Sequence, residues 1–230
     1  MATKEKGAAQ VKETVDFVSR SERFIEKHQM KILYGVGVVI VLAAAVLCVR
    51  YLYLAPREVK AANAIYKGEQ YFDRDSFSLA LHGNGADYAG FESIISDYGS
   101  TRSGNLAKAY AGICYFRLGQ PDKALPLLKA YSGDDKMVAP AVTGLIGDCY
   151  VNLGQVKQGI TYFEKAAKEA DNEVISPTYL KKAGIAYEDL KQYAEAVKAY
   201  QAIKQRYANS QEAADIDKYI TRASELEKQK

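Results

Sequence analysis

The chain lacks most of the residues on which enzyme chemistry depends. It has no tryptophan, three cysteines and two histidines among 230 residues. The histidines, His28 and His82, lie on either side of a long uncharged run, and the cysteines form neither a CxxC motif nor a Cys/His cluster. Phosphate-binding glycine loops, a serine-hydrolase elbow and an HExxH motif are also missing. We therefore predict no catalytic residues, no metal site, no cofactor and no enzymatic activity.

The charge balance has little bias of either sign. The 31 basic and 28 acidic side chains give a net charge of +3, and they are spread along the sequence without a basic block. Nucleic-acid binding needs a concentrated positive patch, so this class of partner is not expected.

One long hydrophobic run stands near the N-terminus. Residues 32–49 read ILYGVGVVIVLAAAVLCV without a charge, and residues 50–55 extend the apolar length with two tyrosines and two leucines. At ~1.5 Å per residue this run spans a hydrocarbon core of ~30 Å. About thirty polar residues precede it, whereas the apolar part of a signal peptide is shorter and lies closer to the start. We predict a single transmembrane helix over 32–55, ended by Pro56.

The charges on either side of this run suggest an orientation. More lysines and arginines precede the run than follow it closely, and positive flanks favour the cytoplasm. We expect residues 1–31 to form a cytoplasmic, helical segment and the remainder to be exported. The bias is small, so the inverted topology stays open, as does self-association, because Gly35 and Gly37 lack the GxxxG spacing.

The strongest internal pattern is a repeat. Three segments align without gaps: LAKAYAGICYFRLGQPDKAL, AVTGLIGDCYVNLGQVKQGI and TYLKKAGIAYEDLKQYAEAV. A glycine and a tyrosine three positions later coincide in all three, at Gly112, Gly147 and Gly184 and at Tyr115, Tyr150 and Tyr187. The spacing of about 35 residues is typical of a tetratricopeptide repeat, in which two antiparallel helices form one unit. The small residue lets the two helices approach closely.

The segments around the three repeats complete the expected domain. Residues 61–81 read as a further first helix, a turn-rich insertion follows at 82–87, and residues 87–101 supply its partner. A C-terminal amphipathic helix is expected to cap the stack. The predicted fold is all-α. Its parts are a cytoplasmic segment 1–31, a transmembrane helix 32–55, a divergent first repeat 56–104, three repeats with a capping helix 105–224, and a frayed tail 225–230.

This arrangement resembles the YfgM family of bacterial inner-membrane proteins, in its Bacteroidetes-type members. The resemblance rests on the short N-terminal arm, the single span, the phrase YLAPRE leading into the first helix, and a repeat domain of this size. It implies an ancillary subunit of the SecYEG translocon with a periplasmic C-terminal domain. It further implies work beside a membrane-anchored chaperone of the PpiD type on exported polypeptides.

The expected binding surface is the inner face formed by the first helices, because stacked helix pairs curve with those helices inside. Helical register predicts that this groove contains Ile65, Glu69, Phe72, Ala109, Ile113, Phe116, Asp148, Val151, Lys181, Ile185 and Glu188. A mixed, partly apolar groove suits extended or helical apolar segments of other proteins. The alternative function is a structural scaffold in an envelope assembly or secretion complex, which uses the same groove for one fixed partner.

Overall fold

The computed structural model describes residues 28–229, and the chain divides into two compact units, Met1–Pro56 and Arg57–Lys230. Helices joined by turns account for these described residues, which contain no β-strand. The predicted all-α fold is therefore confirmed. The expected helix within the cytoplasmic segment 1–31 falls mostly outside the described residues, since only 28–31 belong to them.

In the first unit, helix 28–48 continues into a π-helical turn, η1 (Val49–Leu54), and then into the start of α2 (Ala55–Phe72), most of which belongs to the second unit. The helical stretch His28–Phe72 is long and apolar enough to cross a membrane. The predicted helix end at Pro56 is wrong, because Pro56 lies inside α2. The Ala55 N–H bonds to Arg50 O, five residues back, so the helix is wider just before the proline. That wider turn gives room to a ring that would crowd a regular α-helical carbonyl.

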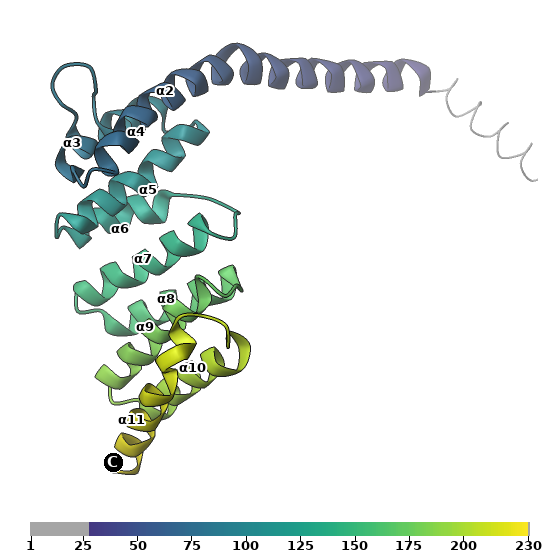
Figure 1. Ribbon diagram of the computed structural model, residues 1–230. Helices are drawn as coiled ribbons and strands as arrows, with labels where there is room; N and C mark the ends of the chain where they lie inside the picture. The colour runs from purple at the N-terminus through teal and green to yellow at the C-terminus, as the bar shows by residue number, and fades with distance from the viewer. Residues whose placement is uncertain (1–27, 230) are drawn as a thin grey trace, which may run out of the picture. The chain divides into compact units, whose positions relative to one another are not determined.

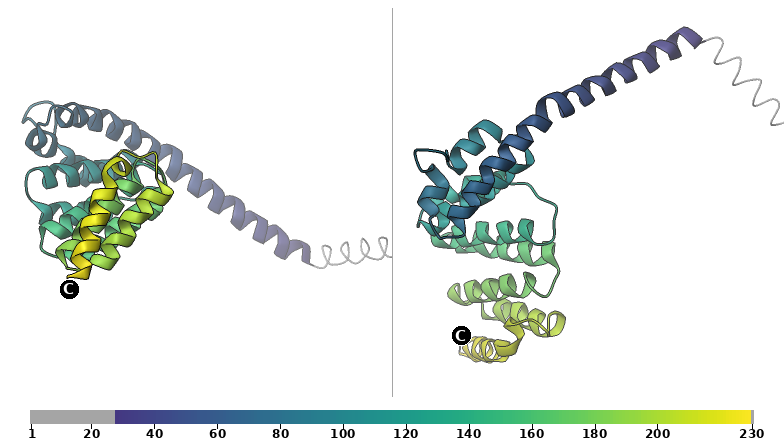
Figure 2. Two further views of the ribbon diagram at one scale, coloured as in Figure 1. Left: turned by 60° about the horizontal axis from the view of Figure 1, so that its bottom comes forward. Right: turned by 45° about the horizontal axis from the view of Figure 1, so that its top comes forward.

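The second unit is a row of helices in which each packs mainly on its neighbours along the chain (Figures 1 and 2). After α2 come α3 (Phe77–His82), α4 (Phe91–Tyr98), α5 (Arg102–Arg117), α6 (Pro121–Ala130), α7 (Val138–Asn152), α8 (Val156–Ala170), α9 (Ser176–Asp189), α10 (Tyr193–Arg206), η2 (Glu212–Asp215) and α11 (Ile216–Lys228). The pairs α5/α6, α7/α8 and α9/α10 correspond to the three aligned sequence segments.

The repeated glycines work as the sequence predicts. A Cβ built on Gly112, Gly147 or Gly184 would lie 2.5, 2.6 or 2.2 Å from a side-chain atom of Leu128, Phe163 or Tyr200, respectively. In each pair the large side chain stands sixteen residues after the glycine, on the second helix of the same repeat. Only a residue without a Cβ permits this approach. The glycine and its partner therefore set the spacing of each helix pair.

The first helix of each repeat ends in the same backbone conformation. Gly119 and Gly154 have φ angles of +73° and +75°, and Lys191 holds the equivalent place with φ +57°. A left-handed residue after the last turn lets the backbone satisfy the final carbonyl groups and reverse direction. In the third repeat this left-handed conformation falls on Lys191, whose Cβ disfavours it.

The divergent first repeat differs from the single helix expected over 61–81. Helix α2 stops at Phe72, and Asp75 adopts φ +55° in the turn before α3. Phe72 and Phe77 meet edge to face across this turn, with ring centroids 5.6 Å apart. The 82–87 insertion is organised by Asn84, whose Oδ1 accepts hydrogen bonds from the backbone N–H groups of Ala86, Asp87 and Tyr88.

Two groups of buried apolar side chains lie at the two ends of the stack. The larger runs from α2 to α7 and contains Phe91, Leu81 and Leu128, together with the free cysteines Cys114 and Cys149. Both are buried, which raises the pKa of each thiol to about 12, so these cysteines pack as small apolar residues. The smaller group joins α10 to α11 through Tyr200, Ile203 and Ile216. Helix α11 reaches Lys228, so residues 225–228, expected to fray, belong to this capping helix.

Candidate functional site

The side chains of residues 28–229 include no group of three or more His, Cys, Asp or Glu placed to hold a metal ion. The second unit has two surfaces that could bind a partner, on two sides of the stack. One is the predicted groove on the first helices. The other is a cleft between second helices that the sequence did not suggest.

The predicted groove residues differ in how much of them a partner can reach. On α2 and α5, Ile65 and Ala109 are only 6% and 2% exposed and belong to the apolar interior. Glu69, Phe72, Ile113 and Phe116 are half-buried. Ile185 on α9 is 47% exposed and is the most accessible apolar residue of the set.

The remaining groove residues on α7 and α9 interact with the neighbouring helix. Val151 is half-buried on α7. Asp148 Oδ2 on α7 accepts from Lys182 Nζ on α9 at 2.7 Å. Burial is the largest influence on the pKa of Asp148 and raises it above the usual value, while Lys182 acts in the opposite direction. The Asp148 carboxylate of the groove is thus engaged by a neighbouring helix of the stack.

A series of polar contacts, which we call the first-helix ladder, extends this arrangement to the C-terminus. Lys181 Nζ donates to Asp215 Oδ1 at 2.9 Å, and Glu188 accepts from Arg222 at 2.9 and 3.0 Å. Thr178 and Glu212 make a similar contact, and all of these pairs, like Asp148 and Lys182, are 34 residues apart. The segment η2–α11 therefore occupies the place of another first helix. It covers Lys181 and Glu188, which had been assigned to the groove.

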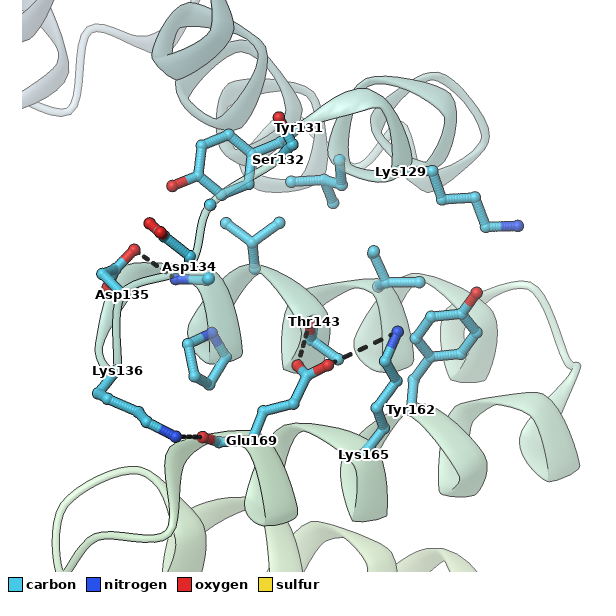
Figure 3. A pocket seen from close by; sticks show the side chains of 16 residues that line it. Lys129, Tyr131, Ser132, Asp134, Asp135, Lys136, Thr143, Tyr162, Lys165 and Glu169 are labelled. Carbon is cyan, nitrogen blue, oxygen red and sulfur yellow. Dashed lines mark hydrogen bonds and ion pairs between the residues drawn. The ribbon is translucent and has the colours of Figure 1, made fainter. Parts of the chain in front are cut away.

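A cleft of about 440 Å³ lies on another side of the stack, bordered by α6, α7, α8 and the connection 131–137 (Figure 3). At about 100° per residue, the α7 residues that line it, Ala139, Val142 and Ile146, project opposite to the groove residues Asp148 and Val151. The cleft is therefore separate from the groove. Apolar side chains and charges of both signs line it.

The charged groups in the cleft are mostly engaged with one another. Glu169 accepts from Thr143 Oγ1 at 2.9 Å, and the Lys136 ammonium donates to the Glu169 backbone carbonyl (Figure 3). The Asp135 carboxylate accepts from the N–H groups of the first residues of α7, and these bonds lower its pKa. Asp134 makes no ion pair or hydrogen bond through its carboxylate to any residue that the structure describes.

Comparison with known proteins agrees with the repeat pattern. Two tetratricopeptide-repeat family models match residues 144–173 and 179–210. The chain contains tetratricopeptide repeats. Tetratricopeptide repeats indicate a protein–protein interaction module. No curated protein matches the sequence.

Solved structures support the same tetratricopeptide fold. TPR-like repeats of a kinesin light chain from Podosopora anserina align with a TM-score of 0.56 at 14% identity, over 74% of this chain and 88% of that one. A crystal structure of MamA aligns with a TM-score of 0.52 at 15% identity, over 73% of this chain and 92% of that one. At these identities the likeness concerns the tetratricopeptide fold alone.

Sequence reasoning missed the cleft although two signals for it exist in the tetratricopeptide repeats. Helix α6 has 10 residues whereas α8 has 15. The alignment of the repeats also puts Thr143 where the third repeat has the larger Leu180. Neither signal belongs to a known motif. A cleft that arises from a shorter helix and a smaller side chain leaves no recognisable pattern in a single sequence.

Proposed function

We propose that the chain is a membrane-anchored protein-interaction module that assists the handling of exported polypeptides beside the Sec translocon. The main support for this proposal is that one chain joins the apolar helix 28–54 to a tetratricopeptide domain. The large apolar side chains of this helix between Met30 and Tyr53 are 40% to 76% exposed. Such a surface is costly in water and matches the hydrocarbon core of a bilayer.

The finer assignment to the Sec translocon and a PpiD-type chaperone is supported by the resemblance to the YfgM family. The expected topology, with a cytoplasmic N-terminus and a periplasmic repeat domain, follows from the flanking charges. Tethering at the membrane raises the local concentration of the binding module near its partners, so a weak groove interaction suffices.

Site-specific photocrosslinking in intact cells tests this function. The crosslinking amino acid is placed at Ile185, the exposed apolar groove residue, and in a matched control at Lys168, an exposed residue of the second helix α8. We expect crosslinks to a translocon subunit or a membrane-anchored chaperone from position 185 and not from 168. If position 185 yields neither, the translocon role is wrong.

The same experiment separates the alternative function. A scaffold subunit of an envelope assembly or secretion complex would give one stable crosslinked partner at Ile185, whatever proteins are being exported. A factor that handles exported polypeptides would give several partners that vary with the secreted load.

Two further measurements test the anchor and its topology. The full chain should remain with the membrane fraction after alkaline extraction, and recovery in the soluble fraction would exclude an anchor. Topology requires an engineered cysteine at an exposed site such as Gly85, because Cys114 and Cys149 are both fully buried and would not react. Labelling of intact cells at Gly85→Cys is expected for a periplasmic domain.

A further inference from the structure

The cleft between α6 and α8 exists because the first complete repeat is shorter than the second. The last five residues of α8 include Ala166, Ala167 and Ala170, all of them buried. The equivalent positions after α6 are occupied by the connection that begins at Tyr131, whose backbone is extended with φ −71° and ψ 140°. Ser132, Gly133 and Asp134 disfavour a helix. The missing last turn of α6 leaves the space that the cleft occupies.

A small side chain on α7 keeps the cleft open. Thr143 lines it, whereas Leu180, at the same place in the third repeat, packs against the apolar group of α10 and α11. Below Thr143 the cleft has an apolar floor formed by Leu128, Val142 and Ile146, each 6% exposed or less. The cleft thus combines an apolar floor with a polar rim, as ligand sites do, and its volume lies in their usual range.

Two consecutive residues of the rim differ in their main-chain hydrogen bonds: Ser132 is bonded on one side, and Gly133 is open. Asn105 on α5 accepts from the Ser132 N–H at 3.2 Å and donates to the Ser132 carbonyl at 2.7 Å. In an extended chain the next residue directs its N–H and C=O to the opposite edge. That residue is Gly133, which lines the cleft and whose backbone N–H and C=O bond to no residue between 28 and 229. The open edge suits pairing with another extended chain.

The negative charge of Asp134 at this rim favours a basic side chain on the paired segment. The exposed carboxylate of Asp134 has no partner among residues 28–229, whereas the neighbouring Asp135 carboxylate caps α7. We propose that the cleft binds an extended peptide segment of a partner protein. The segment pairs with the main chain of Gly133, places an apolar side chain over Val142 and Ile146, and places a lysine or arginine at Asp134.

Fluorescence anisotropy with the full chain in detergent tests the proposal. The probe is the labelled peptide Val-Lys-Val-Lys-Val with blocked ends, and its counterpart is Val-Glu-Val-Glu-Val. We expect the lysine peptide to bind more tightly than the glutamate peptide. N-methylation of the central valine should weaken binding about tenfold, because it removes a main-chain hydrogen bond and adds bulk at the rim. Equal binding of the two peptides, or no effect of N-methylation, would overturn the proposal.

Variants locate the binding in the cleft. Thr143→Leu should fill the cleft and weaken binding at least about tenfold. Asp134→Asn should weaken the lysine peptide about twofold to fivefold. Glu173→Gln, at an exposed position in the next inter-repeat connection, is the control and should have no effect.

The outcomes remain decisive if a core variant folds poorly. Asp134→Asn lies at an exposed position, and N-methylation changes only the peptide, so both remain informative without Thr143→Leu. Tighter binding of the glutamate peptide would instead indicate the lysines at the other end of the cleft, Lys129 and Lys165, and would refute the basic partner.

Discussion

Gly184 and Tyr200 are in direct contact between the two helices of the third repeat. A Cβ on Gly184 would lie 2.2 Å from Tyr200 Cε1. The Tyr200 ring is fully buried, and its hydroxyl donates to Glu188 Oε1 at 2.7 Å. Since Arg222 on α11 bonds to the same carboxylate, this contact joins α9, α10 and the capping helix.

Gly184→Ala should therefore lower the free energy of unfolding of the repeat domain by about 1 to 3 kcal/mol, the usual cost of overpacking a core. Urea denaturation of the full chain in detergent, followed by circular dichroism, measures the change. Gly35→Ala is the control, because a Cβ there meets no atom within 4 Å. An unchanged transition midpoint for Gly184→Ala would show that Tyr200 moves aside freely.

Lys191→Gly should stabilise the third repeat by up to about 1 kcal/mol. Lys191 has a φ angle of +57°, which strains any residue with a Cβ, and glycine relieves this strain. The greater conformational freedom of glycine in the unfolded chain offsets part of the gain. Thermal unfolding compares this variant with Lys191→Ala, which removes the charge but keeps the Cβ. The interpretation requires that only the glycine variant gains stability.

The repeat architecture was readable from the sequence because its determinants are local and periodic. The pairs Gly112–Leu128, Gly147–Phe163 and Gly184–Tyr200 each lie sixteen residues apart, so one alignment identifies all three contacts. The break at Asp75 and the passage of the helix through Pro56 were not readable. Each depends on a single backbone adjustment, a left-handed residue in one case and a π-helical turn in the other, that neighbouring contacts stabilise.

The candidate groove was only partly predictable, for a related reason. Register assigns Lys181 and Glu188 to the inner face, and they do lie on one side of α9. Their engagement by Asp215 and Arg222 depends on how η2 and α11 pack, which the amphipathic pattern of the C-terminal segment does not specify. Burial of Ile65 and Ala109 likewise depends on the divergent first repeat.

The half-buried ion pair between Asp148 and Lys182 gives a pH dependence with a defined sign. The pKa of Asp148 is raised in the folded state above its ordinary value of 3.8. The folded state therefore holds this proton more tightly than the unfolded state. The stability contributed by the group is complete at low pH and is lost as pH rises from 3.8 through the folded pKa.

Asp148→Asn removes this titration. The free energy of unfolding of the wild type minus that of the variant should fall as pH rises through that interval and then level off. Urea denaturation across a series of pH values measures it, and Asp189→Asn, at an exposed position of α9, controls for the loss of one acidic group. A difference that rises with pH would mean that Lys182 outweighs burial.

Ile216→Ala should uncouple the capping helix. Ile216 is 1% exposed and packs in the group shared by α10 and α11, so its truncation should cost about 2 to 5 kcal/mol. Hydrogen exchange should accelerate in α10 and α11 more than in α5. Thr221→Ala, at an exposed position of α11, should leave exchange unchanged. Uniform acceleration throughout the domain would instead indicate a single cooperative unit.

The constant 34-residue offset of the first-helix ladder bears on how far a local fault spreads through the domain. Each rung joins a first helix only to the next first helix, or to the segment η2–α11. In a stack whose units contact only their neighbours, the loss of one rung weakens one junction and leaves the junctions beyond it intact.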